Sequence, residues 1–113
     1  MAIQPAEIRS YTEFWPFYLS QHRRGGTRIL HIGGTVFGLF MLIGAVWTLK
    51  LFWLIVALPI AYGMAWVGHV FIEHNRPAAF SHPFWSLRGD FHMLGLWMTG
   101  RLKAELVRHG ISA

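Results

Sequence analysis

Two long apolar runs dominate the pattern of hydrophobic and polar residues along the chain. They meet at Lys50, and a histidine closes each run at its far end: His31 lies nineteen residues before this lysine and His69 nineteen residues after it. If both runs are helical, the two imidazoles lie roughly 28 Å from the turn, at about 1.5 Å per residue. That distance is close to the thickness of a bilayer core. The pattern therefore predicts transmembrane helices over 29–49 and 51–73 that form a hairpin and hold two histidines at one depth.

A different pattern precedes this hairpin. Residues 6–22 carry one aromatic-rich face at helical spacing, made of Tyr11, Phe14, Trp15, Tyr18, Leu19 and His22. Ser10 and Glu13 match a capping box that would start a helix, whereas Pro16 would break or bend it. Aromatic side chains at this density are typical of the membrane–water interface. We expect an interfacial helix over 6–22 that brings His22 to the same level as His31 and His69.

The chain after the hairpin predicts one further helix, over 90–108. Asp90 is a good N-cap for it, and the apolar part that follows is too short to span a bilayer. From Arg101 onward the residues are mostly charged, so this helix would lie at the interface or against the hairpin. The sequence thus predicts an all-α membrane protein: residues 1–113 form a single membrane domain, with a two-helix transmembrane hairpin between amphipathic N-terminal and C-terminal helices.

Composition agrees with a membrane environment. Only 13% of the 113 residues are charged, against about 25% in typical globular domains, and 54% are hydrophobic. A length of 113 residues favours one domain. Because there is no cysteine, disulfides, iron–sulfur clusters and thiolate zinc sites are excluded. Metal chemistry would have to use carboxylates and the seven histidines.

The basic residues predict the topology. The net charge is +5, but the positive side chains gather at the outer ends of the apolar runs and form no continuous stripe. This arrangement places both termini in the cytoplasm and argues against nucleic acid as a partner. We expect a multi-pass integral protein of a bacterial inner membrane or of the endoplasmic reticulum.

The depth at which His22, His31 and His69 are expected to lie is the candidate functional site. Gly34 and Gly38 share the face of His31 and would let another helix approach closely, which favours an inward-pointing histidine. Glu73 lies one helical turn beyond His69. Three imidazoles with Glu73, or with Asp90 as a weaker candidate, would suit Fe(II), Zn(II) or Mn(II). The same residues could instead serve as structural hydrogen-bonding groups, clamp a haem between two histidines, or pack inside a non-enzymatic membrane adaptor.

The remaining polar residues give weaker signals. His74, His82, His92 and His109 stand beside charged or loop residues and are expected at the surface. Arg28 and Arg76 could bind a substrate carboxylate, although topology-setting charge explains them equally well.

Four stretches of the chain form a set of motifs in a fixed order. They are Phe14-Trp-Pro-Phe-Tyr-Leu-Ser-Gln-His22, Arg28-Ile-Leu-His31-Ile-Gly-Gly-Thr35, Gly68-His69-Val-Phe-Ile-Glu73-His-Asn-Arg-Pro-Ala78 and Pro83-Phe-Trp-Ser-Leu-Arg-Gly-Asp90-Phe91. With these motifs the chain resembles the 2-hydroxy-fatty-acid dioxygenase family of small integral-membrane proteins, over roughly Tyr11 to Leu106.

This resemblance implies an Fe(II)-dependent enzyme of fatty-acid α-oxidation. Such an enzyme uses O2 to shorten a long-chain 2-hydroxy fatty acid by one carbon. By motif, His22, His31 and His69 are the implied catalytic iron ligands, with Glu73 beside them. Membrane lipid is a further expected partner, and self-association stays open.

Overall fold

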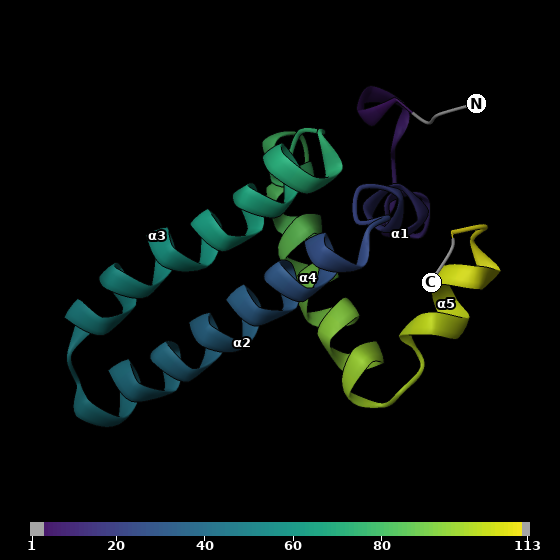
Figure 1. The fold of residues 1–113 in the computed structure, drawn as a ribbon. Helices are drawn as coiled ribbons and strands as arrows, with labels where there is room; N and C mark the ends of the chain where they lie inside the picture. Colours follow the sequence, from purple (N-terminus) through teal and green to yellow (C-terminus); the bar gives the residue numbers. More distant parts are fainter. Residues whose placement is uncertain (1–3, 112–113) are drawn as a thin grey trace.

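The computed structural model of the protein describes residues 4–111, and the regular structure in that part of the chain is entirely helical. The longer elements are α1 (Tyr11–Ser20), α2 (Gly25–Thr48), α3 (Leu51–Val67), α4 (Pro83–Met98) and α5 (Leu102–Arg108). Short turns of helix cover Pro5–Glu7, Gly68–Glu73 and Ala78–Phe80. Figure 1 shows α2 and α3 side by side, with their connecting turn at one end of the molecule and with α1 and α5 beyond the other end.

Close backbone contact holds α2 against α3. A Cβ atom on Gly34 would lie 2.9 Å from the backbone oxygen of Ala61, so only glycine fits at this crossing. The turn between the helices is tight: Leu49 adopts a left-handed conformation with φ of 57°, and Lys50 is the N-cap of α3. The sequence places the turn correctly because its lysine is the one charged residue between the two apolar runs.

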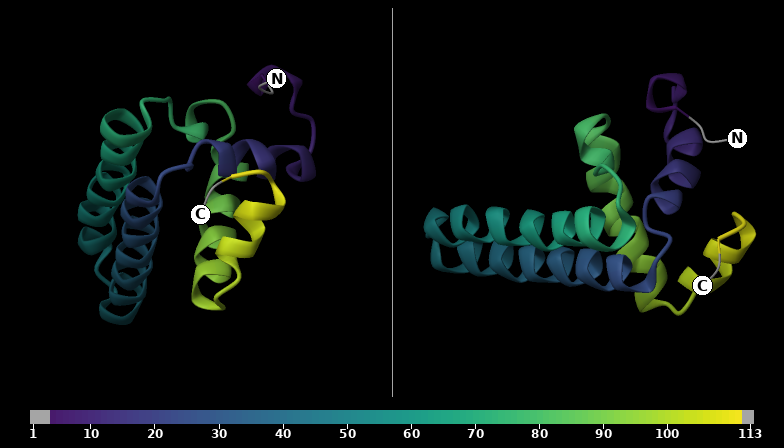
Figure 2. Two further views of the ribbon diagram at one scale, coloured as in Figure 1. Left: turned by 45° about the vertical axis from the view of Figure 1, so that its right-hand side comes forward. Right: turned by 45° about the horizontal axis from the view of Figure 1, so that its top comes forward.

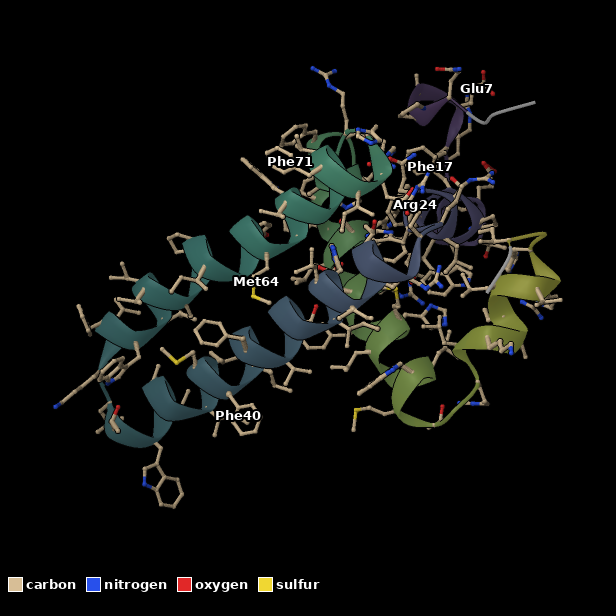
Figure 3. The ribbon with its side chains drawn as sticks, viewed as in Figure 1. Glu7, Phe17, Arg24, Phe40, Met64 and Phe71 are labelled. Atoms are coloured by element: carbon tan, nitrogen blue, oxygen red, sulfur yellow. The ribbon has the colours of Figure 1, made fainter. Side chains whose placement is uncertain are left out.

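Both helices are long and apolar enough to cross a membrane. The candidate spans are Gly25–Thr48 and Leu51–Glu73, and only 22% and 11% of their most apolar windows are buried. Large apolar side chains point away from the molecule, among them Phe40 and Phe71, which are 72% and 71% exposed (Figure 3). Contiguous exposed apolar surface of this kind is unusual for a water-soluble monomer.

The remaining helices pack together at the open end of the α2–α3 pair, where α4 crosses it (Figure 2). Their shared core includes Phe14, Tyr18 and Leu19 from α1, Met93 from α4 and Leu106 from α5, all fully or almost fully buried. Helix α4 also contacts α2, so it joins this core to the α2–α3 pair.

Close packing of α1 on α4 depends on one glycine. A Cβ atom on Gly89 would lie 2.9 Å from two carbons of the Tyr18 ring, so the aromatic ring of α1 rests directly on the α4 backbone. This contact brings the end of α1 against the middle of α4.

The helix starts agree in part with the sequence. The Ser10 side chain accepts a hydrogen bond from the Glu13 N–H at the start of α1, as the capping pattern predicts. The predicted helix over 6–22 is too long: α1 spans Tyr11–Ser20, and Pro5–Glu7 forms a separate 3-10 turn. Pro16 lies inside α1 and does not break it. Helix α2 begins at Gly25, earlier than the predicted residue 29, and α3 continues beyond Val67 as a π-helical turn to Glu73.

The predicted C-terminal helix over 90–108 is wrong in its start and its continuity. Helix α4 begins at Pro83, since proline is favoured in the first helical turn, and Asp90 lies in mid-helix instead of at an N-cap. The chain then turns at Gly100, whose φ is +72°, and α5 is a separate helix.

Candidate metal centre

Three buried histidines from three different elements meet at one point. His22 follows α1, His31 lies in the second turn of α2, and His69 lies in the π-helical turn after α3. One ring nitrogen of each lies within 4.8 Å of the corresponding nitrogens of the other two. The ring centroids are 4.5 Å apart for His22 and His31, 4.6 Å for His22 and His69, and 5.7 Å for His31 and His69.

The outer ring nitrogen of each histidine binds an oxygen atom. His22 Nδ1 lies 2.7 Å from the backbone oxygen of Tyr18, and His31 Nε2 lies 2.5 Å from Asp90 Oδ1. A carbonyl oxygen and an ionised carboxylate only accept hydrogen bonds, so both nitrogens carry the proton. His22 Nε2 and His31 Nδ1, the inner nitrogens, are therefore unprotonated in the neutral rings.

Asn75 fixes the third ring in the same way. Its Nδ2 donates to the backbone oxygen of Gln21 at 3.1 Å, which orients its Oδ1 toward His69 Nδ1 at 2.7 Å. His69 Nδ1–H is thus the donor, and Nε2 is left with a lone pair. The loop after the π-helical turn and the loop after α1 together set the orientation of His69.

These protonation states suit a metal ion. His22 Nε2 and His31 Nδ1 face each other at 3.3 Å, and with both protons committed elsewhere no hydrogen bond joins them. Two nitrogens bound to one metal at about 2.1 Å lie roughly 3.0–3.4 Å apart in octahedral or tetrahedral geometry. An outward hydrogen bond from each imidazole to an oxygen is the usual support of a metal-binding histidine. The donor set of three neutral imidazoles fits Fe(II), Zn(II) or Mn(II).

Burial keeps His22 in the form that binds metals. Loss of hydration, together with the nearby His31 and His69 rings, holds the pKa of His22 well below its usual value of 6.5. The ring is therefore neutral at physiological pH, as metal ligation requires.

The two candidate carboxylates lie outside this group of three. Glu73 Oε1 accepts a hydrogen bond from the backbone N–H of Arg24, the N-cap of α2, and so ties the end of the π-helical turn to the start of α2. Asp90 lies behind His31, where its Oδ1 also accepts a hydrogen bond from the Tyr18 hydroxyl at 2.7 Å. Asp90 is thus placed to position His31.

Neither arginine proposed for a substrate carboxylate lines the cavity beside the histidines. Arg28 Nη1 donates to the backbone oxygens of His22 and Arg23, at 2.9 and 2.7 Å, and so holds the loop that carries His22. Arg76 is exposed and lines a separate pocket with Gln4 and Phe80.

The other histidines lie outside the centre. His74 is exposed, and His82 stacks on Trp85 with its Nδ1 2.9 Å from Ser81 Oγ. His92 is half-buried, not freely solvated as predicted: its ring stacks on Trp15 at 3.7 Å between centroids. His109 contacts Glu105.

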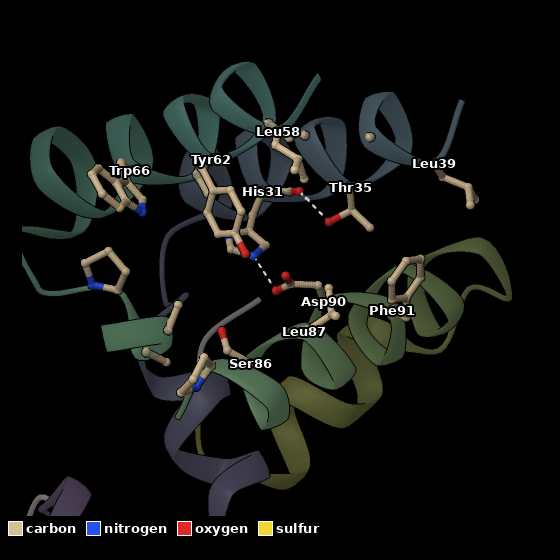
Figure 4. Close-up of a pocket in the computed structure, with 18 of the residues that line it drawn as sticks. His31, Thr35, Leu39, Leu58, Tyr62, Trp66, Ser86, Leu87, Asp90 and Phe91 are labelled. Atoms are coloured by element: carbon tan, nitrogen blue, oxygen red, sulfur yellow. Dashed lines mark hydrogen bonds and ion pairs between the residues drawn. The ribbon is translucent and has the colours of Figure 1, made fainter. Parts of the chain in front are cut away.

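An elongated apolar cavity of about 260 Å³ leads away from the histidines between α2, α3 and α4 (Figure 4). Its polar end is formed by His31, His69, Asp90, Tyr62 and Ser86. Its walls include Gly34, Thr35, Gly38, Leu58, Ala61, Leu87 and Phe91, and Leu42 and Leu54 lie toward the α2–α3 turn. Small residues on α2 leave the space that this cavity occupies.

Sequence reasoning missed the residues that support the histidines. In the sequence, Asn75 and Tyr18 stand out only as members of the family motifs and, for Tyr18, of the aromatic face. Asn75 directly follows the left-handed residue that ends the helical segment, where a polar side chain can turn back toward the preceding turn. Tyr62 lies seven residues before His69 and so shares its helical face in the sequence pattern, whereas Ser86 carries no comparable local signal.

Comparison with known proteins gives one match. Residues 8–102 match the family described as 2-hydroxy-palmitic acid dioxygenase Mpo1-like. No curated protein and no solved structure matches the chain. The matched segment includes all three histidines, Asn75, Asp90 and the whole cavity. With most of its length covered, the chain belongs to this family, described as 2-hydroxy-palmitic acid dioxygenase Mpo1-like.

Proposed function

We propose that the protein is a membrane-embedded, Fe(II)-dependent dioxygenase that shortens long-chain 2-hydroxy fatty acids by one carbon. The observation that carries this proposal is the histidine centre: three buried imidazoles present unprotonated nitrogens to one point at the end of an apolar cavity. Family membership supplies the reaction class, and the absence of thiolate ligands favours iron over copper(I).

The reaction balances without a separate reductant. Oxidation of C2 from the alcohol to the carboxylic acid releases three electrons, and loss of C1 as CO2 releases one more. O2 accepts these four electrons, so that the 2-hydroxy acid and O2 give the shortened acid, CO2 and water. Iron(II) bound to the histidines would supply the redox chemistry that lets O2 react with the acid.

The residues of the chain have separate tasks in this reaction. His22, His31 and His69 hold the metal, while Tyr18 O, Asp90 and Asn75 fix the ring orientations through their hydrogen bonds. The apolar walls of the cavity exclude water from the reacting carbons and hold the alkyl chain.

The direct test supplies Fe(II), O2 and 2-hydroxypalmitate to purified protein and measures the C15 acid by mass spectrometry. Alanine at His22, His31 or His69 should abolish both iron content and product. His74→Ala is the matched control, because this histidine is exposed and outside the centre. Wild-type protein that retains iron and forms no C15 acid would refute the proposed activity.

A bis-histidine haem is the second function considered, and the geometry does not favour it. Axial imidazoles bind opposite faces of a flat macrocycle, whereas three rings here converge with centroids 4.5–5.7 Å apart. A Soret band in purified protein would favour haem. A membrane adaptor with purely structural histidines would contain no metal, and elemental analysis distinguishes that case.

The proposed topology places both termini in the cytoplasm and the Lys50 turn on the opposite side of the membrane. The support is the basic sequence at the open end of the α2–α3 pair and the length of the two apolar helices. Because the chain lacks cysteine, single-cysteine labelling is a clean test. A membrane-impermeant maleimide applied to intact cells should modify Lys50→Cys and spare Arg108→Cys; the opposite pattern would reverse the topology.

A further inference from the structure

The polar end of the cavity contains two hydroxyl groups that make no hydrogen bond within the described residues. Ser86 is only 6% exposed, and its hydroxyl points into the cavity (Figure 4). The Tyr62 side chain extends from α3 into the cavity toward His31 and Asp90 (Figure 4). Within residues 4–111, neither hydroxyl has a hydrogen-bond partner, in contrast to Thr35, whose hydroxyl donates to the His31 backbone oxygen at 3.0 Å.

The Ser86 side chain is buried, whereas Tyr62 is 48% exposed, and both residues line the cavity. Unpaired polar groups that line an apolar cavity are suited to bind a ligand. Here they stand next to the histidine centre, at the end opposite Leu42 and Leu54. Along α2, His31 and Leu42 are eleven residues apart, or about 16 Å. One polar end and a long apolar body fit a single-chain amphiphile.

We propose that the Tyr62 and Ser86 hydroxyls bind the carboxylate of a long-chain acid whose alkyl chain occupies this cavity. The inference rests on the proposed function, which supplies the acid. In this proposal the two hydroxyls bind the carboxylate in place of Arg28 and Arg76, because among the described residues no lysine or arginine lines the cavity.

The charges at this end make acid binding depend on the metal. The ionised Asp90 carboxylate alone would repel a second carboxylate in this poorly hydrated site. A divalent cation on three neutral imidazoles outweighs that charge by one unit, and one bound carboxylate then makes the site neutral. The two hydroxyls add donors that favour a carboxylate over an ester or a hydrocarbon end.

The size of the cavity, and not hydrophobic affinity, should determine which alkyl-chain lengths bind. An acyl chain that moves from lipid into this cavity leaves one apolar surrounding for another, so each methylene gains little. Chains that are too long for the cavity are excluded. Leu54, which lies close to the α2–α3 turn, is placed at the far end of this space.

The test measures equilibrium binding of radiolabelled 2-hydroxypalmitate to the detergent-solubilised Fe(II) protein under argon, where no turnover occurs. Tyr62→Phe and Ser86→Ala should each raise the dissociation constant about 10-fold or more, the usual cost of a hydrogen bond to a charged group. Iron content should not change. Ser81→Ala is the matched control, because Ser81 lies outside the cavity and donates to the Ala78 backbone oxygen.

Two further measurements separate the parts of the proposal. Removal of iron should abolish binding of the acid in wild-type protein. Leu54→Trp should weaken binding of 2-hydroxypalmitate and leave binding of 2-hydroxydecanoate unchanged. Unchanged dissociation constants in both hydroxyl variants, with iron retained, would overturn the inference.

Failure of the inference and failure of the proposed function give different results. If wild-type protein forms no C15 acid but Tyr62→Phe and Ser86→Ala weaken binding, the dioxygenase assignment falls and the carboxylate site stands. If C15 acid forms and neither variant changes the dissociation constant or KM, the carboxylate site falls and the dioxygenase assignment stands.

Discussion

Replacement of Asp90 by asparagine tests how the fold supports the metal centre. Asp90 Oδ1 accepts hydrogen bonds from His31 Nε2 at 2.5 Å and from the Tyr18 hydroxyl at 2.7 Å. Asparagine has nearly the same shape and keeps one carbonyl oxygen for these donors. Asp90→Asn therefore removes mainly the negative charge that makes the His31 imidazole a stronger electron donor.

The expected loss of metal affinity is 10-fold to 100-fold, the range found for supporting carboxylates of metal-binding histidines. This range corresponds to about 1.4–2.7 kcal/mol. The assay is an anaerobic titration of Fe(II) against a competing chelator, together with thermal unfolding of the metal-free protein to confirm an intact fold.

Tyr18→Phe is the informative control for Asp90→Asn. It removes one donor to the same carboxylate oxygen and leaves the contact between His31 and Asp90 in place, so its effect on metal affinity should be smaller. Equal iron affinity for wild type and Asp90→Asn, in a folded protein, would refute the assignment of Asp90 as a positioning residue.

Three further predictions concern the support of the site and of the fold. Asn75→Ala removes the acceptor that fixes the third imidazole and should weaken iron binding about 10-fold to 100-fold in the same titration. Gly34→Ala places a methyl group 2.9 Å from a backbone oxygen of α3 and should lower the free energy of unfolding by about 1–3 kcal/mol, whereas Gly44→Ala, whose methyl group would meet no other part of the described structure, should not lower it. Glu105 has a pKa below its usual 4.5, chiefly because the Trp15 Nε1–H donates to it at 3.0 Å. Its ionised form stabilises the fold fully above the pKa of the unfolded chain, and this contribution is lost as pH falls through the lower pKa of the folded state. Thermal stability should therefore fall less between pH 6 and pH 3 in Glu105→Gln than in wild type; an equal fall in both would contradict the contribution of this carboxylate.

The sequence alone determined the depth along the two apolar helices at which the site forms. Residue counts along two adjoining apolar helices measure depth directly, because each residue of a helix rises by a fixed distance. His31 and His69 stand equally far from Lys50, and His22 follows a helix with an aromatic face, so their meeting could be predicted before any packing was known. The family resemblance, too, was carried by these local motifs.

The tertiary structure decided what surrounds the three histidines. Asp90 reaches His31 across 59 residues of sequence because α4 begins at Pro83 and crosses α2, and no periodicity reports how two helices cross. Likewise, Tyr62 and Ser86 come from different helices and share a cavity that Gly34 and Gly38 of α2 also line, where these glycines let α3 approach closely. Helical spacing fixes the face and height of a residue, whereas the partner on that face depends on side-chain packing between segments distant in the chain.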